Sequence, residues 1–505
     1  MSTRNSLIGL FVICISFALV EGGGTPLPYW PGQGTLENPY QITNITELRA
    51  IDNDGGIWCG KVFKLMNDID FSQAAYSGAV VCPDTDVAVD DFQGVIFSGV
   101  FDGNGHVISN LAFNRSAYED TNDRLSYLGL FGKTSQATIK NLTIENFSFT
   151  MSSYSTSNLG IVYSQIGALV GRAYGSTIDN CHAESNIKCW KAYAECSYIG
   201  GLCGSVKETT LTNCSSVAKF EINVEVGEVI GGLIGESVDQ STIQNCTSQV
   251  DMIGGYTIGG IAGSVRKTSV SKCFAEGIVN GVGDTGGLIG NAYMSTVKKS
   301  GAKTSVYGRI NGNSSGYGTG GLVGYCDADI DPQVPASPDY QTIENCYWQG
   351  VVLAYSHAGG IAGVVDATTS ISKCYAAGLC DYPDSLTLPS PSDIPTASSG
   401  ETMGSFVGSG LSASYDYCYF DKWLCGHIGV GDASTDPISK RDTYAMKKAA
   451  TFPDWDFDNV WFVIDDKFFP ILQWQAAAYK GDTNLDGTVE LVDFMTLAEN
   501  WLDSI

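Results

Sequence analysis

Oxygen-bearing side chains recur at regular intervals near the C-terminus of the chain. Residues 482–493 place them at the first, third, fifth and twelfth positions of a loop that has a glycine at the sixth position. Calcium takes six to eight oxygen ligands, and this spacing wraps them around one ion. The sequence therefore predicts a calcium site. Its predicted ligands are the side chains of Asp482, Asn484, Asp486 and Asp493 and the carbonyl of Thr488, with Glu490 acting through water.

Other reactive groups do not form a recognisable catalytic motif. The four histidines stand in unrelated contexts, and no Cys/His spacing for zinc is present. Gly312–Gly316 matches the nucleophile-elbow pattern but lies in a Gly/Ser loop without the required strand and helix. Because acidic residues are mostly exposed, we interpret the neighbouring carboxylates as solvated loops and predict no catalytic residue. Those carboxylates are Asp68 and Asp70, Asp84 and Asp86, Asp90 and Asp91, and Asp327, Asp329 and Asp331.

The composition limits both the fold and the partners. Glycine accounts for 60 of 505 residues, and only 16% of the residues are charged, which favours strands and turns over long solvent-facing helices. The net charge of −26 excludes a surface that neutralises phosphates, so we do not expect nucleic acid as a partner.

An apolar stretch near the N-terminus indicates export. It runs from Leu7 to Val20 after Arg4 and is too short to span a bilayer. We interpret residues 1–22 as a signal peptide. No later stretch is long and apolar enough to hold the chain in a membrane, so we expect a secreted or cell-surface protein.

A glycine phrase, Gly-Gly-aliphatic-x-Gly, organises most of the chain. It recurs at 200–204, 231–235, 259–263, 286–290, 320–324 and 359–363, with looser copies that end at Gly132, Gly171 and Gly408. Successive closing glycines are 27 to 45 residues apart, which is typical of a solenoid. Short alternating runs between the phrases indicate two or three strands per repeat. We therefore predict an all-β fold, a parallel β-helix or β-solenoid over residues 116–430, with a small α-helical calcium-loop module at the C-terminus.

A column of cysteines accompanies the glycine phrase. A cysteine follows the closing glycine by ten or eleven residues in six repeats, and Ser300 takes that place once. We expect small buried thiols, with disulfides between coils as the alternative. Asparagines precede several of these cysteines, and we interpret them as stacked amides rather than glycosylation sites. They are Asn180, Asn213, Asn245 and Asn345, with Asn141 in the equivalent place before Leu142.

The repeats resemble the GLUG motif of large exported bacterial surface proteins. Upstream, residues 38–42, 64–70 and 97–108 resemble the lead-in of such proteins, and the aromatic segment around Trp455, Trp461 and 469–472 resembles the one that closes these arrays. The resemblance implies a solenoid fold, export and a loose association with adhesion. It gives a lead-in or cap at 23–115, the repeats at 116–430 and an aromatic C-terminal cap at 431–475.

Residues 479–505 resemble one half of a type I dockerin. The calcium loop is followed by Phe494–Leu502, which matches the loop-helix arrangement of that family. Dockerins carry two such segments, which present residues to a cohesin, whereas this chain has one. The resemblance implies calcium binding and leaves a cohesin-like partner open.

Two functions follow from these features. The first is a secreted, non-catalytic binding protein of the adhesion type, whose partner is a cell-surface protein or glycan and whose C-terminal segment docks in a calcium-dependent way. The second is a polysaccharide-degrading enzyme, a glycoside hydrolase or lyase, recruited by the dockerin-like tail. We favour the first, because no residue pattern identifies catalysis.

Overall fold

The computed structural model of the protein describes residues 29–72, 76–86, 91–116, 125–152, 163–190, 198–223, 228–308, 317–327, 341–355, 357–381, 402–410 and 412–476. The predicted signal peptide and the predicted calcium-loop module lie outside these residues. Within them, no helix has the length and apolar character that crossing a membrane requires.

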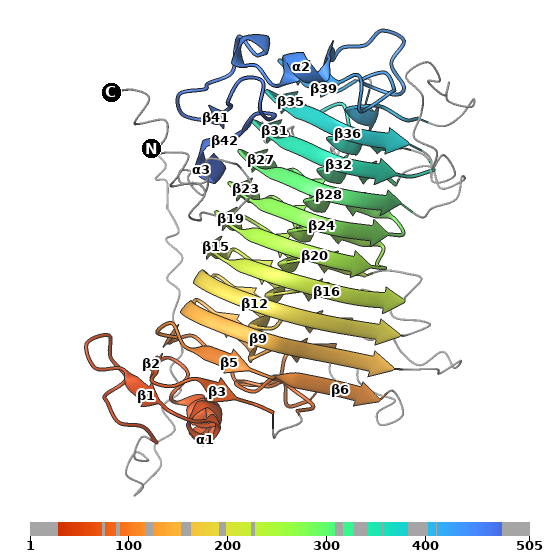
Figure 1. The fold of residues 1–505 in the computed structure, drawn as a ribbon. Helices are drawn as coiled ribbons and strands as arrows, with labels where there is room; N and C mark the ends of the chain where they lie inside the picture. The colour runs from red at the N-terminus through yellow and green to blue at the C-terminus, as the bar shows by residue number, and fades with distance from the viewer. Residues whose placement is uncertain are drawn as a thin grey trace, which may run out of the picture.

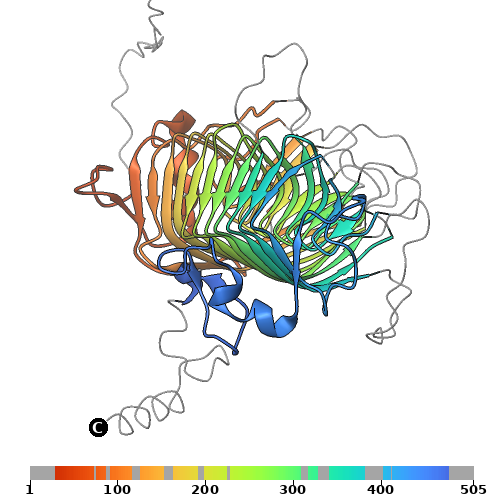
Figure 2. The same cartoon turned by 90° about the horizontal axis from the view of Figure 1, so that it is seen from above.

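Parallel strands stack into a solenoid with three long sheets (Figure 1). Sheet A has 23 strands, sheet B nine and sheet C eight. Figure 2 shows the coils following one another from the N-terminal to the C-terminal end. The prediction of an all-β, solenoid-like fold is therefore confirmed.

Most coils contain four strands, more than the two or three predicted, whereas the coils of β9 (Thr138–Ser152) and β12 (Thr177–Trp190) contain three, within the predicted number. One coil comprises β13 (Tyr198–Gly200) in sheet C, β14 (Cys203–Lys207) in sheet B, and β15 (Thr210–Thr212) and β16 (Ser215–Asn223) in sheet A. Asn213, with a positive φ of 56°, lies at the break between β15 and β16, although the equivalent Asn180 has a similar φ of 51° inside the continuous strand β12. A run that alternates continuously in sequence is split in two at Asn213.

The other coils repeat this order. Sheet C also contains β7 (Leu125–Leu128), β10 (Tyr163–Ile166), β17 (Val229–Gly231), β21 (Thr257–Gly259), β25 (Asp284–Gly286), β29 (Thr319–Gly320) and β33 (Ala358–Gly359). Sheet B also contains β8 (Phe131–Ser135), β11 (Val170–Tyr174), β18 (Ile234–Val238), β22 (Ala262–Arg266), β26 (Ile289–Tyr293), β30 (Val323–Asp327), β34 (Ala362–Val365) and β37 (Val407–Ser409).

Sheet A begins before the first glycine phrase. Its other strands are β1 (Tyr40–Ile42), β2 (Val62–Leu65), β3 (Ile69–Asp70), β4 (Val100–Asp102), β5 (Val107–Ser109), β6 (Ala112–Ser116), β9 (Thr138–Ser152), β12 (Thr177–Trp190), β19 (Thr242–Gln244), β20 (Thr247–Ile253), β23 (Ser269–Ser271), β24 (Phe274–Gly281), β27 (Thr296–Lys298), β28 (Gly301–Gly308), β31 (Thr342–Glu344), β32 (Tyr347–Leu353), β35 (Ser370–Ser372), β36 (Tyr375–Asp381), β38 (Ser414–Asp416), β39 (Tyr419–Asp421) and β40 (Ser439–Arg441).

Rows of like residues form the core. Exposed and buried residues alternate strictly along β20, where Val250 and Met252 point inward. Across the coils, aliphatic side chains stack in register because each coil offers the same inward position to the next. One such row, fully buried throughout, is Ile139, Ile178, Leu211, Ile243, Val270, Val297, Ile343 and Ile371.

The glycine phrase forms the corner between sheets C and B. A Cβ atom on Gly232, the second glycine of its phrase, would lie 2.1 Å from the carbonyl oxygen of Gly260 in the next coil. The aliphatic residue that follows, Leu233, is fully buried. Stacking of the coils therefore requires glycine at this position, because the backbones of successive coils approach too closely here for a side chain.

The cysteine column points into the core, as predicted. Cys214 and Cys273 are buried, and their thiols donate to the carbonyls of Thr212 at 3.2 Å and Ser271 at 3.3 Å. Ser300 keeps the same geometry, with a hydroxyl bond of 2.9 Å to Lys298. All fourteen cysteines in the described part of the chain are free thiols, so the alternative of disulfides between coils is wrong for them.

Additional segments cover the N-terminal end and one outer face of the solenoid. The N-terminal end carries α1 (Ile45–Arg49), the 3₁₀ turns η1 (Ala50–Asp52) and η2 (Asp54–Gly56), and an aromatic cluster. Near the C-terminus lie α2 (Thr443–Met446), η3 (Ala449–Thr451), β41 (Trp461–Phe462), β42 (Ile471–Leu472) and α3 (Gln473–Ala476).

The C-terminal aromatic segment packs on the outside of sheet A (Figure 1). The Tyr375 hydroxyl donates to the Pro470 carbonyl at 2.7 Å, and the Trp461 indole donates to Asn345 Oδ1 at 3.1 Å. Trp474 reaches back to the carbonyl of Lys299 at 3.0 Å. The segment thus runs along several coils and removes this part of sheet A from solvent.

Candidate binding surface

The outer faces of sheets B and C meet along a line of closing glycines. A Cβ on Gly204 would lie 2.5 Å from the backbone nitrogen of Ile166, which belongs to sheet C of the preceding coil. Gly235 approaches Ile199 in the same way, with 2.6 Å between the same atoms. The two sheets therefore turn their outer faces toward one another along the solenoid.

Two rows of outward residues flank this line. The row on sheet C holds Tyr127, Gln165, Tyr198, Val229, Thr257 and Asp284. The row on sheet B holds Lys133, Arg172, Ser205, Glu236, Ser264, Asn291 and Tyr325. We call these two rows the polar corner. Side chains of opposite rows contact each other directly, and successive residues in one row are about 4.8 Å apart.

The N-terminal end of the polar corner is cationic and aromatic. Lys133 Nζ lies 5.8 Å from the ring centroid of Tyr127 and 5.2 Å from that of Phe92. Arg172 donates a hydrogen bond to the Tyr127 hydroxyl. Burial lowers the pKa of Lys133, and the neighbouring Arg172 lowers it further, although Asp91 acts in the opposite direction. Two partly desolvated cations therefore lie side by side.

Uncharged and acidic side chains follow in the next coils. Gln165 is only 6% exposed, and its Oε1 accepts no hydrogen bond. Tyr198 and Ser205 donate to Glu236, with 3.4 Å between Ser205 Oγ and Glu236 Oε2. Burial raises the pKa of Glu236, while Arg266 and Arg172 partly offset that rise.

Asp284 is the central group of the C-terminal end. Its carboxylate accepts from Asn291 Nδ2 at 3.1 Å and from the Gly318 backbone at 3.2 Å. Burial raises the pKa of Asp284 to about 6, and these two hydrogen bonds act against a further rise to which Asp327 contributes. Tyr256 packs edge-on against Tyr317, with 4.9 Å between ring centroids. This end therefore combines tyrosines with a carboxyl group that titrates near neutral pH.

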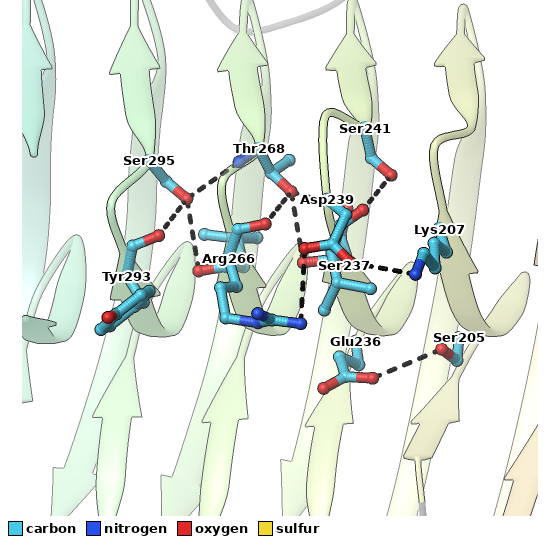
Figure 3. A network of polar contacts seen from close by, with 12 residues as sticks. Ser205, Lys207, Glu236, Ser237, Asp239, Ser241, Arg266, Thr268, Tyr293 and Ser295 are labelled. Carbon is cyan, nitrogen blue, oxygen red and sulfur yellow. Dashed lines mark hydrogen bonds and ion pairs between the residues drawn. The ribbon is translucent and has the colours of Figure 1, made fainter. Parts of the chain in front are cut away.

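A separate ion-pair cluster lies beside the polar corner on sheet B (Figure 3). Asp239 bridges Lys207 at 3.1 Å and Arg266 at 3.4 Å, whereas Ser205 and Glu236 form their own contact away from it. Because the charged groups of this cluster are partly exposed, their ion pairs contribute little to stability. It also offers matched control residues outside the polar corner.

The predicted site residues fall in several places. The calcium ligands at 482–493 lie outside the described residues, and no group of three metal-ligating side chains occurs in the described ranges. Asp68 accepts from His106 and Val107, while Asp70 accepts from Asn110 and Ser72, so these carboxylates stabilise local turns. Asp327 differs, because its charge acts on Asp284 in the polar corner.

Sequence reasoning did not single out the residues of the polar corner. A positional signal was nevertheless present, because every member flanks a glycine phrase. Tyr198 and Asp284 stand two residues before the first glycine, and Glu236 and Asn291 stand directly after the closing glycine. The phrase positions the backbone, and its flanking residues are free to carry function.

Comparison with known proteins agrees with this repeat architecture. The GLUG motif matches residues 163–188, which cover β10, β11 and most of β12. These residues form one coil of the solenoid. The findings support a GLUG-repeat protein. A stretch of 189 residues, 37% of the chain, is 31% identical to Halomucin of Haloquadratum walsbyi, and the chain spans only 2% of the length of that relative.

A solved structure also resembles the chain. It is described as a putative immunoglobulin A1 protease from Bacteroides ovatus and is 18% identical, with a TM-score of 0.32. The alignment covers 88% of this chain and 94% of that one. At this level of similarity it carries no functional argument.

Proposed function

We propose that the protein is an exported surface protein that binds an extended glycan along the polar corner. The observation that carries this proposal is Gln165, a buried amide whose Oε1 accepts no hydrogen bond, between two tyrosines of the same row. A buried acceptor without a partner is costly, and a ligand hydroxyl would satisfy it. Tyr198, the partly exposed member of this pair, has a flat apolar ring with a polar tip, which suits a sugar ring, whereas Tyr127 is buried.

The repeating geometry favours a polymer over a compact ligand. Coils rise by about 4.8 Å, so equivalent positions recur along the solenoid axis at about the length of one sugar unit in an extended chain. The polar corner continues over the coils from Tyr127 to Tyr325. A glycan laid along it would meet tyrosine, amide and carboxylate groups in succession.

Export and docking complete the proposed function. The predicted signal peptide at 1–22 and the similarity to Halomucin support a place outside the cell. The loop at 482–493 supports calcium-dependent docking of the C-terminal segment to another protein.

Calorimetry on the mature chain tests the predicted calcium site. We expect Asp486→Ala to weaken calcium binding severely and Glu490→Gln to weaken it less, since Glu490 acts through water. Unchanged calcium affinity in Asp486→Ala would reject the site.

One observation favours polysaccharide hydrolysis as a second candidate. Burial and the charge of Asp327 raise the pKa of Asp284 to about 6. In a pair of carboxyl groups with different pKa values, the group with the higher pKa can act as the acid and the other as the base. A depolymerisation assay on each bound glycan decides between the two functions. Shortened products that disappear in Asp284→Asn would favour hydrolysis, and intact glycan would favour binding alone.

A glycan array with the mature chain tests the binding proposal. Tyr198→Ala removes a ring from the polar corner, so we expect it to weaken retention on the array at least tenfold. Tyr174 is an exposed tyrosine on β11 outside the polar corner, so Tyr174→Ala is the matched control and should bind as the native chain does. Absence of any bound glycan, or equal loss in both variants, would reject the proposal.

A further inference from the structure

We propose that Arg172, with Gln165 and Tyr127, forms a subsite for an acidic sugar at the N-terminal end of the polar corner. The inference rests on the proposed glycan binding and adds the class of sugar: a uronic acid carried by an otherwise neutral chain. Three features of the described residues lead to it.

The first feature is the state of Arg172. It lies on β11 between Lys133 and Ser205 of the neighbouring coils. Lys133 has a carboxylate partner, Asp91, at 3.8 Å. Arg172 makes no such ion pair in the described part of the chain, although its charge acts on the Glu236 carboxylate from farther away. Its guanidinium donates to the neutral hydroxyl of Tyr127 instead. A planar guanidinium presents a fork of donors that matches a carboxylate.

The second feature is the Gln165 side chain, which precedes Arg172 in the same coil. Its Oε1 is an acceptor and therefore needs a donor, which a fully ionised anion such as sulfate does not supply. Arg172 needs an acceptor. A single ligand that carries a carboxylate together with hydroxyl groups meets both requirements, and an acidic sugar has both.

The third feature is the charge of the rest of the polar corner. Beyond the cationic end come Glu236 and Asp284, and the chain as a whole has a net charge of −26. A chain with an anionic group on every unit would be repelled by these coils. Neutral sugars, however, can donate hydroxyl protons to the carboxylates. The charge pattern therefore fits one acidic sugar at the Arg172 end, followed by neutral units.

Flanking tyrosines complete the subsite. Tyr127 and Tyr198 pair with Gln165 from the two neighbouring strands of sheet C, so the amide lies between two rings. Phe92 packs edge-on against Tyr127, with 5.2 Å between ring centroids, and covers this end. The aromatic surroundings limit solvent access, which strengthens the attraction between the guanidinium and a bound carboxylate.

The test compares glycans that differ only at the carboxyl group. Glucuronoxylan oligosaccharides and other uronate-bearing chains of the array are measured beside their carboxyl-reduced forms by calorimetry on the full mature chain. We expect at least one acidic glycan to bind ten times more tightly than its reduced form, with an affinity that falls as salt is added. Arg172→Gln should abolish this preference, and Arg172→Lys should restore it in part.

Two further variants make the result decisive. Lys207 lies on the same sheet, paired with Asp239 outside the polar corner, so Lys207→Gln should retain the preference. Gln165→Leu should weaken both the acidic and the reduced glycan while leaving the protein at least as resistant to unfolding, because it removes an unsatisfied buried group. Equal binding of acidic and reduced forms, unaffected by Arg172→Gln, would overturn the acidic subsite and leave glycan binding intact. Failure of the native chain to bind any glycan would overturn both.

Discussion

Asn245 donates from its side-chain amide to Oδ1 of Asn213, one coil earlier, at 2.6 Å. Both residues have a positive φ of 56°, and both precede a cysteine of the cysteine column. The same amide contact joins Asn180 to Asn141 at 2.9 Å. Asparagine suits this corner in two ways, because it tolerates the left-handed backbone and also links the coils, although other coils place a lysine such as Lys272 there with a similar φ of 52°.

Substitutions at Asn245 should separate these two roles. Asn245→Gly keeps the backbone conformation and loses one hydrogen bond, at a cost of about 1 kcal/mol in the free energy of unfolding. Asn245→Ala adds the strain of a left-handed alanine, for a total of about 2 kcal/mol. Urea unfolding measures both values. Equal losses in the two variants would mean that backbone strain has no part in the effect.

A second prediction concerns the glycine corner. Gly232→Ala would bring a methyl group within 2.1 Å of the Gly260 carbonyl, so the coils must separate locally. We expect a loss of several kcal/mol, or failure to fold, because backbone atoms cannot move aside as a flexible side chain can. Gly426→Ala is the control, since nothing lies within 4 Å of its added Cβ. Thermal unfolding should show little change for Gly426→Ala.

A third prediction concerns the core thiols. Burial raises the pKa of Cys203 and Cys273 well above the usual value for a thiol. Only the thiolate is nucleophilic, so neither should react with an alkylating reagent at mildly alkaline pH while the protein is folded. Peptide mapping by mass spectrometry should find both labelled only after denaturation. Rapid labelling of either cysteine in the native protein would contradict the burial of these thiols.

A fourth prediction is a pH dependence that arises at Asp284. Its folded-state pKa of about 6 lies above the ordinary aspartate pKa of 3.8, so between these pH values the folded protein keeps a proton that the unfolded chain releases. The stability contribution of the carboxyl group therefore falls as the pH rises from about 4 to about 6. Asp284→Asn does not titrate, so its stability relative to the native protein should increase over this range by up to about 3 kcal/mol.

Urea unfolding of both proteins at pH 4 and pH 7 measures this difference. Asp416→Asn, at an exposed position on β38, accounts for the general effect of removing a negative charge. A stability difference between Asp284→Asn and the native protein that is the same at both pH values would show that Asp284 does not titrate in this range.

The solenoid could be predicted from the sequence because its determinants are local and repeated. Each glycine phrase specifies a corner where a side chain would collide, and each cysteine or Ser300 marks the same inward position ten or eleven residues later. Periodicity made these requirements visible, since an identical environment in every coil selects the same residue types. The number of strands per coil could not be predicted, because the same left-handed asparagine separates two strands at Asn213 and lies inside a single strand at Asn180.

The polar corner depended on tertiary structure. Tyr198 and Glu236 are separated by a complete coil in sequence, yet they share a hydrogen bond because sheets B and C turn their outer faces together at the closing glycines. These positions have a constant place beside the glycine phrase, but their residue types differ from coil to coil, so no residue pattern singled them out. By itself the sequence determined the solenoid fold and the expectation of export and calcium binding. Only the tertiary structure decided which outward residues of sheets B and C meet, because backbone contacts between coils at the closing glycines bring the two sheets together.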